Sequence, residues 1–165
     1  MCDYIYLDGY FQAPDDASSR YDDAKHMFYW YVDMRRLKNY KENKKIFVSV
    51  QQISFRGNIS ITADADDYIK NTTCELITNL RLNNSYNSYG KNNVLLLCDA
   101  NVNTHTLYIE SSSCNNNSYL TFEINSITDR IELGVNYQNK YIDFNVSDED
   151  CQFFKCLLKF EYEDK

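Results

Sequence analysis

The sequence predicts an all-β fold, a sandwich or barrel of eight or nine short strands. The 165 residues include 15 Tyr and 9 Phe but only 4 Gly and 1 Pro, and aromatic residues favour the pleated, half-buried surface of a strand. The 19 Asn residues can adopt the turn conformations for which so few glycines are available. Apolar and polar residues also alternate through much of the second half of the chain.

The chain is long enough for one core, and we expect an N-terminal arm (1–24) followed by one globular domain (25–165). The arm contains six aspartates, and its pattern fits neither a full strand nor a helix. Four large aromatics favour docking on a partner over disorder of this terminal segment. These candidate partner-binding residues are Tyr4, Tyr6, Tyr10 and Phe11.

The first predicted strand of the domain covers residues 27–34. Phe28 and Trp30 fall on one face, and Tyr29 and Tyr31 on the other. Because both faces carry aromatics, we expect the strand to be covered on both sides.

The following connection is strongly basic. Residues 35–45 contain six basic side chains and one acidic side chain, whereas residues 1–34 contain two basic and seven acidic ones. Three interpretations stay open: a solvated loop, a seat for the acidic arm of another copy, or contact with nucleic acid or a membrane surface. The candidate partner-binding residues here are Arg35, Arg36 and Lys38.

Residues 46–55 form a strong strand pattern whose register changes midway, which predicts a bulge or bend near Gln51 and Gln52. A short strand is expected at 59–62. Residues 71–82 fit both a strand and a short helix, and the capping-box spacing of Thr72 and Glu75 favours the helix. The polar residues 83–93 would then form an exposed loop.

The rest of the chain is predicted to be mostly strand, because apolar residues recur there at every second position. The expected strands cover 94–98, 107–110, 120–125, 130–135, 142–146 and 154–162.

Motifs that would indicate catalysis or a cofactor are missing from the sequence. The histidines, His26 and His105, belong to no recognisable motif, and the chain has no phosphate-binding glycine loop and no dinucleotide fingerprint. The acidic loop 64–67 lacks the spacing of a calcium site. We therefore expect no cofactor, no metal and no enzymatic activity.

Charge and cysteine content narrow the class of protein further. A net charge of -7 does not suit a protein that coats nucleic acid as a whole. Residues 1–10 have no signal-peptide features and no apolar stretch is long enough to span a bilayer, so we expect a chain that is neither secreted nor membrane-spanning. The six cysteines are then expected to be reduced and buried. The five N-x-S/T sequons are weak evidence with so many Asn residues.

Strand pattern and spacing resemble a known family. The strand Lys45–Phe55, the apolar run Asn92–Leu97, the segment Ile127–Leu133 and the final strand Phe153–Tyr162 are similar to those of the single jelly-roll minor capsid proteins of virophages and related large eukaryotic DNA viruses, above all their penton proteins. The resemblance covers roughly residues 27–162 and includes no insertion domain between strands.

The resemblance implies an eight-stranded single jelly-roll β-sandwich with an extended N-terminal arm. It also implies a structural role as a homopentamer at icosahedral vertices, in contact with major and other minor capsid proteins, in a virion assembled in the host cytoplasm or viral factory. The alternative is a non-enzymatic jelly-roll binding module, lectin-like or cytokine-like, that recognises a glycan or a receptor through its loops.

Overall fold

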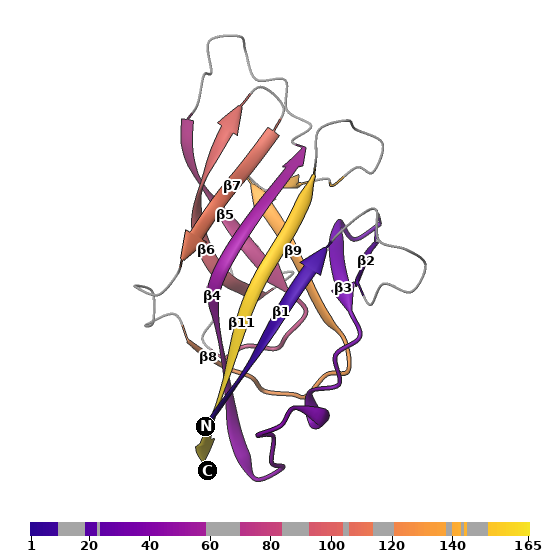
Figure 1. Ribbon diagram of the computed structural model, residues 1–165, viewed down its shortest axis with the longest axis vertical. Helices are drawn as coiled ribbons and strands as arrows, with labels where there is room; N and C mark the ends of the chain where they lie inside the picture. Colours follow the sequence, from indigo (N-terminus) through magenta and orange to yellow (C-terminus); the bar gives the residue numbers. More distant parts are fainter. Residues whose placement is uncertain are drawn as a thin grey trace.

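The computed structural model describes residues 1–9, 19–22, 24–58, 70–83, 93–103, 106–113, 121–137, 140–142, 144 and 152–165. These residues form strands and one short 3₁₀-helix, η1 (Figure 1). In chain order the elements are β1 (Cys2–Gly9), β2 (Ser19–Asp22), β3 (Met27–Trp30), η1 (Met34–Arg36), β4 (Lys44–Asn58), β5 (Lys70–Thr78), β6 (Asn93–Asn103), β7 (Thr106–Ser113), β8 (Phe122–Glu123), β9 (Ile131–Tyr137), β10 (Lys140–Tyr141) and β11 (Phe153–Asp164). Within these ranges no helix has the length and apolarity to cross a membrane.

The described strands form one antiparallel sheet in the order β1-β11-β4-β7-β6-β5-β9-β3-β2, with β8 added to β4 and β10 added to β9. The sheet coils, so that β1, β11 and β4 lie in front of β9 and β5 (Figure 1). No described ladder joins β1 to β2 or β3, so the sheet is not closed. The all-β prediction is confirmed. The predicted number of eight strands is too low, because the described residues alone form eleven.

The N-terminal segment belongs to the sheet, which corrects the expectation that residues 1–24 lie outside it. Every residue of β1 is in register with β11, from Cys2 opposite Glu161 to Gly9 opposite Phe154. The side chain of Leu7 is buried in the core. The expectation was wrong because the outward-facing residues Tyr4 and Tyr6 are large aromatics. Inward and outward positions of this strand therefore look alike in the sequence. Residues 10–18 lie outside the described residues.

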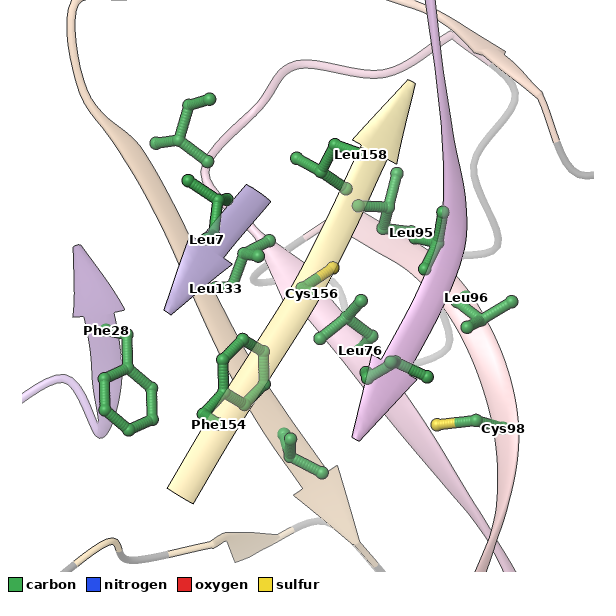
Figure 2. Packing of buried hydrophobic residues seen from close by; sticks show 14 of the residues in the cluster. Leu7, Phe28, Leu76, Leu95, Leu96, Cys98, Leu133, Phe154, Cys156 and Leu158 are labelled. Atoms are coloured by element: carbon green, nitrogen blue, oxygen red, sulfur yellow. The ribbon is translucent and has the colours of Figure 1, made fainter. Parts of the chain in front are cut away.

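The core lies between the front and back parts of the coiled sheet. Leu158 and Cys156 of β11 point into it, as do Leu133 of β9 and Leu76 of β5 (Figure 2). All four are at most 1% exposed. Burial of a leucine side chain contributes about 1.5–3 kcal/mol, so this contact between layers dominates the stability of the fold.

Aromatic rings fill the place where the two ends of the sheet approach. Phe28 of β3 lies 5.1 Å from Phe154 of β11 and 4.8 Å from Phe144, centroid to centroid. Gly9 of β1 touches the same ring, and a Cβ at Gly9 would lie 2.6 Å from the Phe28 Cδ1 atom. Trp30 donates a hydrogen bond from Nε1 to the Asp8 carbonyl oxygen at 3.1 Å. Side chains therefore connect β1 and β3 where no ladder does, and we call this contact the seam.

The predicted bulge near Gln51 and Gln52 is confirmed. Leu157 of β11 pairs with Gln52 and the next residue, Leu158, pairs with Val50, so Gln51 has no partner on β11. The inserted residue reverses the parity of β4, and Val50 before it and Ile53 after it are both buried.

The helix predicted within residues 71–82 is wrong. Lys70–Thr78 is strand β5, which pairs with β6 on one side and with β9 on the other. Cys74 and Leu76 are buried and Thr73 is exposed, as strand alternation requires. The hydrogen bonds and burial that two neighbouring strands supply outweigh the weak local preference of a capping box.

Several other expectations have mixed outcomes. The strands expected at 94–98, 107–110 and 154–162 lie within β6, β7 and β11, and the strand expected at 130–135 matches β9 except at Arg130. Of the strand expected at 120–125, β8 covers Phe122–Glu123. The first predicted strand is shorter than expected, because β3 ends at Trp30 and η1 begins at Met34. Residues 59–62, 64–67, 84–92 and His105 lie outside the described residues.

Candidate assembly surface

The candidate assembly surface begins at the edge of β1 that faces away from β11. Tyr162 of β11 donates its main-chain N–H to the Met1 carbonyl oxygen at 3.3 Å. In an antiparallel pair the main-chain groups alternate in direction, so the odd-numbered residues of β1 face β11 and the even-numbered residues face away. The outward carbonyls of Cys2 and Asp8 agree with this alternation, because side chains from outside the ladder bind both of them.

These two contacts cap the ends of the β1 edge and leave its middle unpaired. Asn39 Nδ2 donates to the Cys2 carbonyl at 2.9 Å, and Trp30 Nε1 donates to the Asp8 carbonyl. Between them lie the outward N–H and C=O groups of Tyr4 and Tyr6, and no hydrogen bond from another described residue reaches them. An edge of this kind can accept a strand from another chain.

The side chains of Tyr4 and Tyr6 stand on the outer face of the same strand. They are 58% and 57% exposed, which is high for a large aromatic side chain. Tyr4 lies opposite Lys159, and Tyr6 lies opposite Leu157. Beside Tyr6, the bulged part of the sheet forms a shallow depression of about 210 Å³ that is lined by Gln52, Lys155 and Leu157, among others.

An ion pair borders this aromatic surface. Lys159 Nζ lies 2.6 Å from Glu161 Oε1, and this hydrogen bond raises the pKa of Lys159 above its ordinary value. The lysine therefore stays charged beside Tyr4 across the physiological range of pH.

The basic connection after β3 is only partly neutralised. Asp33 caps η1 by accepting a hydrogen bond from the Arg35 main-chain N–H at 3.1 Å, and it also binds the Arg35 Nε atom at 2.9 Å. The guanidinium of Arg36 lies 3.7 Å from the same carboxylate, but the side chain is 89% exposed. Arg35, with its neighbouring cation, holds the pKa of Asp33 below its usual value.

Farther along the connection, Lys44 forms an ion pair with Asp164 of β11. Lys38, Lys41 and Lys45 are exposed, and none of them is paired with an acidic group of the described residues. This part of the molecule thus presents a cluster of solvated cations, which we call the basic segment (35–45).

The acidic strand and the basic segment meet within one chain. Asp3 of β1 accepts hydrogen bonds from the main-chain N–H of Asn39 at 3.0 Å and from its side-chain amide at 2.8 Å. The Tyr162 hydroxyl donates to the same carboxylate at 2.8 Å. Burial and this hydrogen bond to Asp3 raise the pKa of Tyr162. An aspartate of the same chain therefore contacts the basic segment at Asn39, and a seat for the acidic arm of another copy stays a prediction.

Sequence reasoning located only part of this surface. Tyr4, Tyr6, Arg35, Arg36 and Lys38 are all exposed. Tyr10 and Phe11 lie outside the described residues. Asn39 and Trp30 were not predicted, and they are 37 and 22 residues away from the carbonyls that they cap, beyond the reach of a local pattern.

Metal ligands and relatives add nothing to this description. Among the residues that the structure describes, no group of three or more His, Cys, Asp or Glu side chains is arranged to hold a metal ion. Comparison with protein families, with curated proteins and with solved structures finds no match to this chain.

Proposed function

We propose that this protein is a structural subunit that assembles with copies of itself, as the penton-type capsid proteins that its sequence resembles do. The observation that carries the proposal is the middle of the β1 edge, which no other described strand pairs and beside which the side chains of Tyr4 and Tyr6 are exposed. Unpaired strand edges and exposed aromatics are both typical of surfaces that bind another chain.

The strand order supports a jelly roll within this proposal. Strands β5, β6 and β7 are consecutive neighbours and β4 lies beside β7, which is a Greek-key arrangement. The chain also passes repeatedly between the part of the sheet made of β1, β11, β4 and β7 and the part made of β6, β5, β9 and β3. Two Greek keys in two facing layers define the jelly roll.

A second surface is needed for a ring of identical subunits, because a ring uses head-to-tail contacts between two different patches. The basic segment supplies it in this proposal. Arg36 and Lys38 are exposed, and a guanidinium placed over a tyrosine ring is favourable by about 0.5–1 kcal/mol at an exposed site. Tyr4 and Tyr6 of one subunit would thus meet the basic segment of the next, and five such contacts would close the ring.

Such a subunit acts by assembly and has no catalytic step. Its partners are then further copies of itself and the major and minor capsid proteins around a vertex, in a virion put together in the host cytoplasm or viral factory. The wedge-like sandwich provides rigidity for packing about a symmetry axis, and the exposed edge provides the contact.

Native mass spectrometry over a range of chain concentrations tests the proposal. We expect a pentamer for the wild type and loss of the pentamer for the double variant Tyr4→Ser/Tyr6→Ser. Tyr31→Ser is the matched control, because Tyr31 is 64% exposed but lies outside β1. A wild type that is monomeric at high concentration would overturn the proposal and favour a monomeric binding module.

A further variant separates the main-chain edge from the side chains. Tyr6→Pro removes an N–H group that points away from β11, so the β1–β11 ladder keeps its hydrogen bonds. If assembly uses the edge, Tyr6→Pro weakens it more than Tyr6→Ser does. Equal effects of the two substitutions would restrict the contact to the tyrosine side chain.

A further inference from the structure

A pair of cysteines in the back of the sheet forms a second site, separate from the assembly surface. Cys74 of β5 and Cys98 of β6 are directly opposite each other in the ladder. Their Sγ atoms lie 3.2 Å apart, and both side chains are buried, at 1% and 8% exposure. Figure 2 places Cys98 beside the core, on a strand next to Leu76.

Each thiol is also close to the main chain of its partner. Cys74 Sγ lies 3.5 Å from the Cys98 carbonyl oxygen, and Cys98 Sγ lies 3.7 Å from that of Cys74. These weak contacts hold both sulfur atoms between the two strands. The thiols therefore face each other and do not turn out to solvent.

This geometry is close to that of a disulfide. Opposite residues of an antiparallel pair have Cβ atoms about 4.5–5.5 Å apart, and a disulfide needs about 3.5–4.5 Å. With sulfur atoms 3.2 Å apart, bond formation requires an approach of roughly 1 Å, which side-chain rotation and a small local shift of the strands can provide.

We propose that Cys74 and Cys98 are a two-electron redox site that a small peroxide converts into a cross-strand disulfide. The more exposed sulfur, that of Cys98, attacks one peroxide oxygen as the thiolate, the O–O bond breaks, and the released hydroxide takes up a proton to become water. The sulfenic acid left on Cys98 is then attacked by the sulfur of Cys74, and a second water leaves. Two thiols and one peroxide thus give one disulfide and two waters.

The surroundings of the pair select the oxidant and limit the rate. A buried site admits hydrogen peroxide more easily than a bulky disulfide reagent. The hydrogen bond between the two thiols and burial raise the pKa of Cys98, so thiolate is scarce at neutral pH and oxidation is slow. Closing the bond ties β5 to β6 and restrains the unfolded chain over the segment between the two cysteines.

Oxidation of the full chain, in its folded state, tests this inference. The folded protein is treated with hydrogen peroxide, the chain is then unfolded, the remaining thiols are alkylated, and peptides are mapped by mass spectrometry. We expect a Cys74–Cys98 linked peptide and a rise in Tm of roughly 5–10 °C that a reducing agent reverses. The inference is wrong if both cysteines stay alkylatable, if they are oxidised to sulfinic acid without a link, or if either pairs with another cysteine.

Two single variants assign the roles of the sulfur atoms. In Cys74→Ser the resolving sulfur is missing, so the sulfenic acid on Cys98 should persist and be trapped when the oxidised chain is unfolded in the presence of dimedone. In Cys98→Ser peroxide should leave the Tm unchanged. Because the main measurement uses the wild-type chain, the inference stays testable even where a serine at a buried position lowers stability.

Discussion

Strands β1 and β5 differ in how many neighbouring strands they pair with and in how deeply they are buried. β5 has β6 on one side and β9 on the other, and its residues Cys74 and Leu76 are at most 1% exposed. Among the described strands β1 pairs with β11 alone, and two of its side chains, Tyr4 and Tyr6, are more than half exposed. The difference indicates that the buried side chains between the layers carry the stability, whereas the β1 edge leaves main-chain groups unpaired within the described part of the chain.

The largest expected loss of stability comes from a substitution in β5. Leu76→Ala removes a fully buried side chain from between the layers, and we expect it to lower the free energy of unfolding by about 2–5 kcal/mol. Urea unfolding at one fixed chain concentration measures the change.

Leu97→Ala is the matched control for that substitution. Leu97 lies on the neighbouring strand β6 and is 42% exposed, so the same truncation there should cost well under half as much. Equal losses for the two variants would contradict the assignment of stability to the buried side chains between the layers.

A smaller effect is expected at the seam. Gly9→Ala places a methyl group 2.6 Å from the Phe28 ring and forces the aromatic cluster to shift, at a cost of about 1–3 kcal/mol. Hydrogen exchange should accelerate in β1 before it does so in β5, because the seam contacts β1 and not β5.

The coupling between the two residues checks this explanation. Phe28→Leu vacates part of the space that the new methyl group needs, so the double variant should be more stable than the two separate losses predict. Strict additivity would show that the cost of Gly9→Ala arises elsewhere.

The smallest loss of stability is expected where Tyr162 of β11 contacts the beginning of β1. Tyr162→Phe removes the hydrogen bond to Asp3 and should cost about 1 kcal/mol at neutral pH. The folded chain raises the pKa of Tyr162 above its ordinary value of 10.0, so the contribution of this group is complete below pH 10 and is lost as the pH rises further. The stability gap between wild type and Tyr162→Phe should therefore narrow above pH 10. A gap that stays constant in urea unfolding up to pH 11 would contradict this linkage.

The sequence predicts the interior strands better than the first one. The parity change between Val50 and Ile53 required an inserted residue, and the bulge at Gln51 is where that pattern placed it. The helix predicted within 71–82 failed because the spacing of Thr72 and Glu75 reports only local preference, whereas β5 is fixed by neighbours that are distant in the chain. The first strand was missed because its outward positions are tyrosines.

The site is predictable in composition but not in arrangement. Exposed tyrosines and unpaired cations are visible in the sequence, and Tyr4, Tyr6 and Arg36 are exposed as expected. The capping of β1 by Asn39 depends on a contact between residues 37 positions apart. Likewise, no spacing rule pairs Cys74 with Cys98, because only the register of β5 and β6 brings them together.

The two caps on β1 also set a limit on how much a partner strand can add. Asn39 and Trp30 occupy the outward carbonyls of Cys2 and Asp8, so within the described part of the chain Tyr4 and Tyr6 are the residues of this edge that offer both an N–H and a C=O to an incoming strand. A ladder limited to these groups makes few hydrogen bonds, and short or blocked edges are one way in which natural proteins limit continuous strand addition. In the proposed assembly, so short a ladder would keep each contact weak, so that a misplaced subunit could dissociate and be replaced.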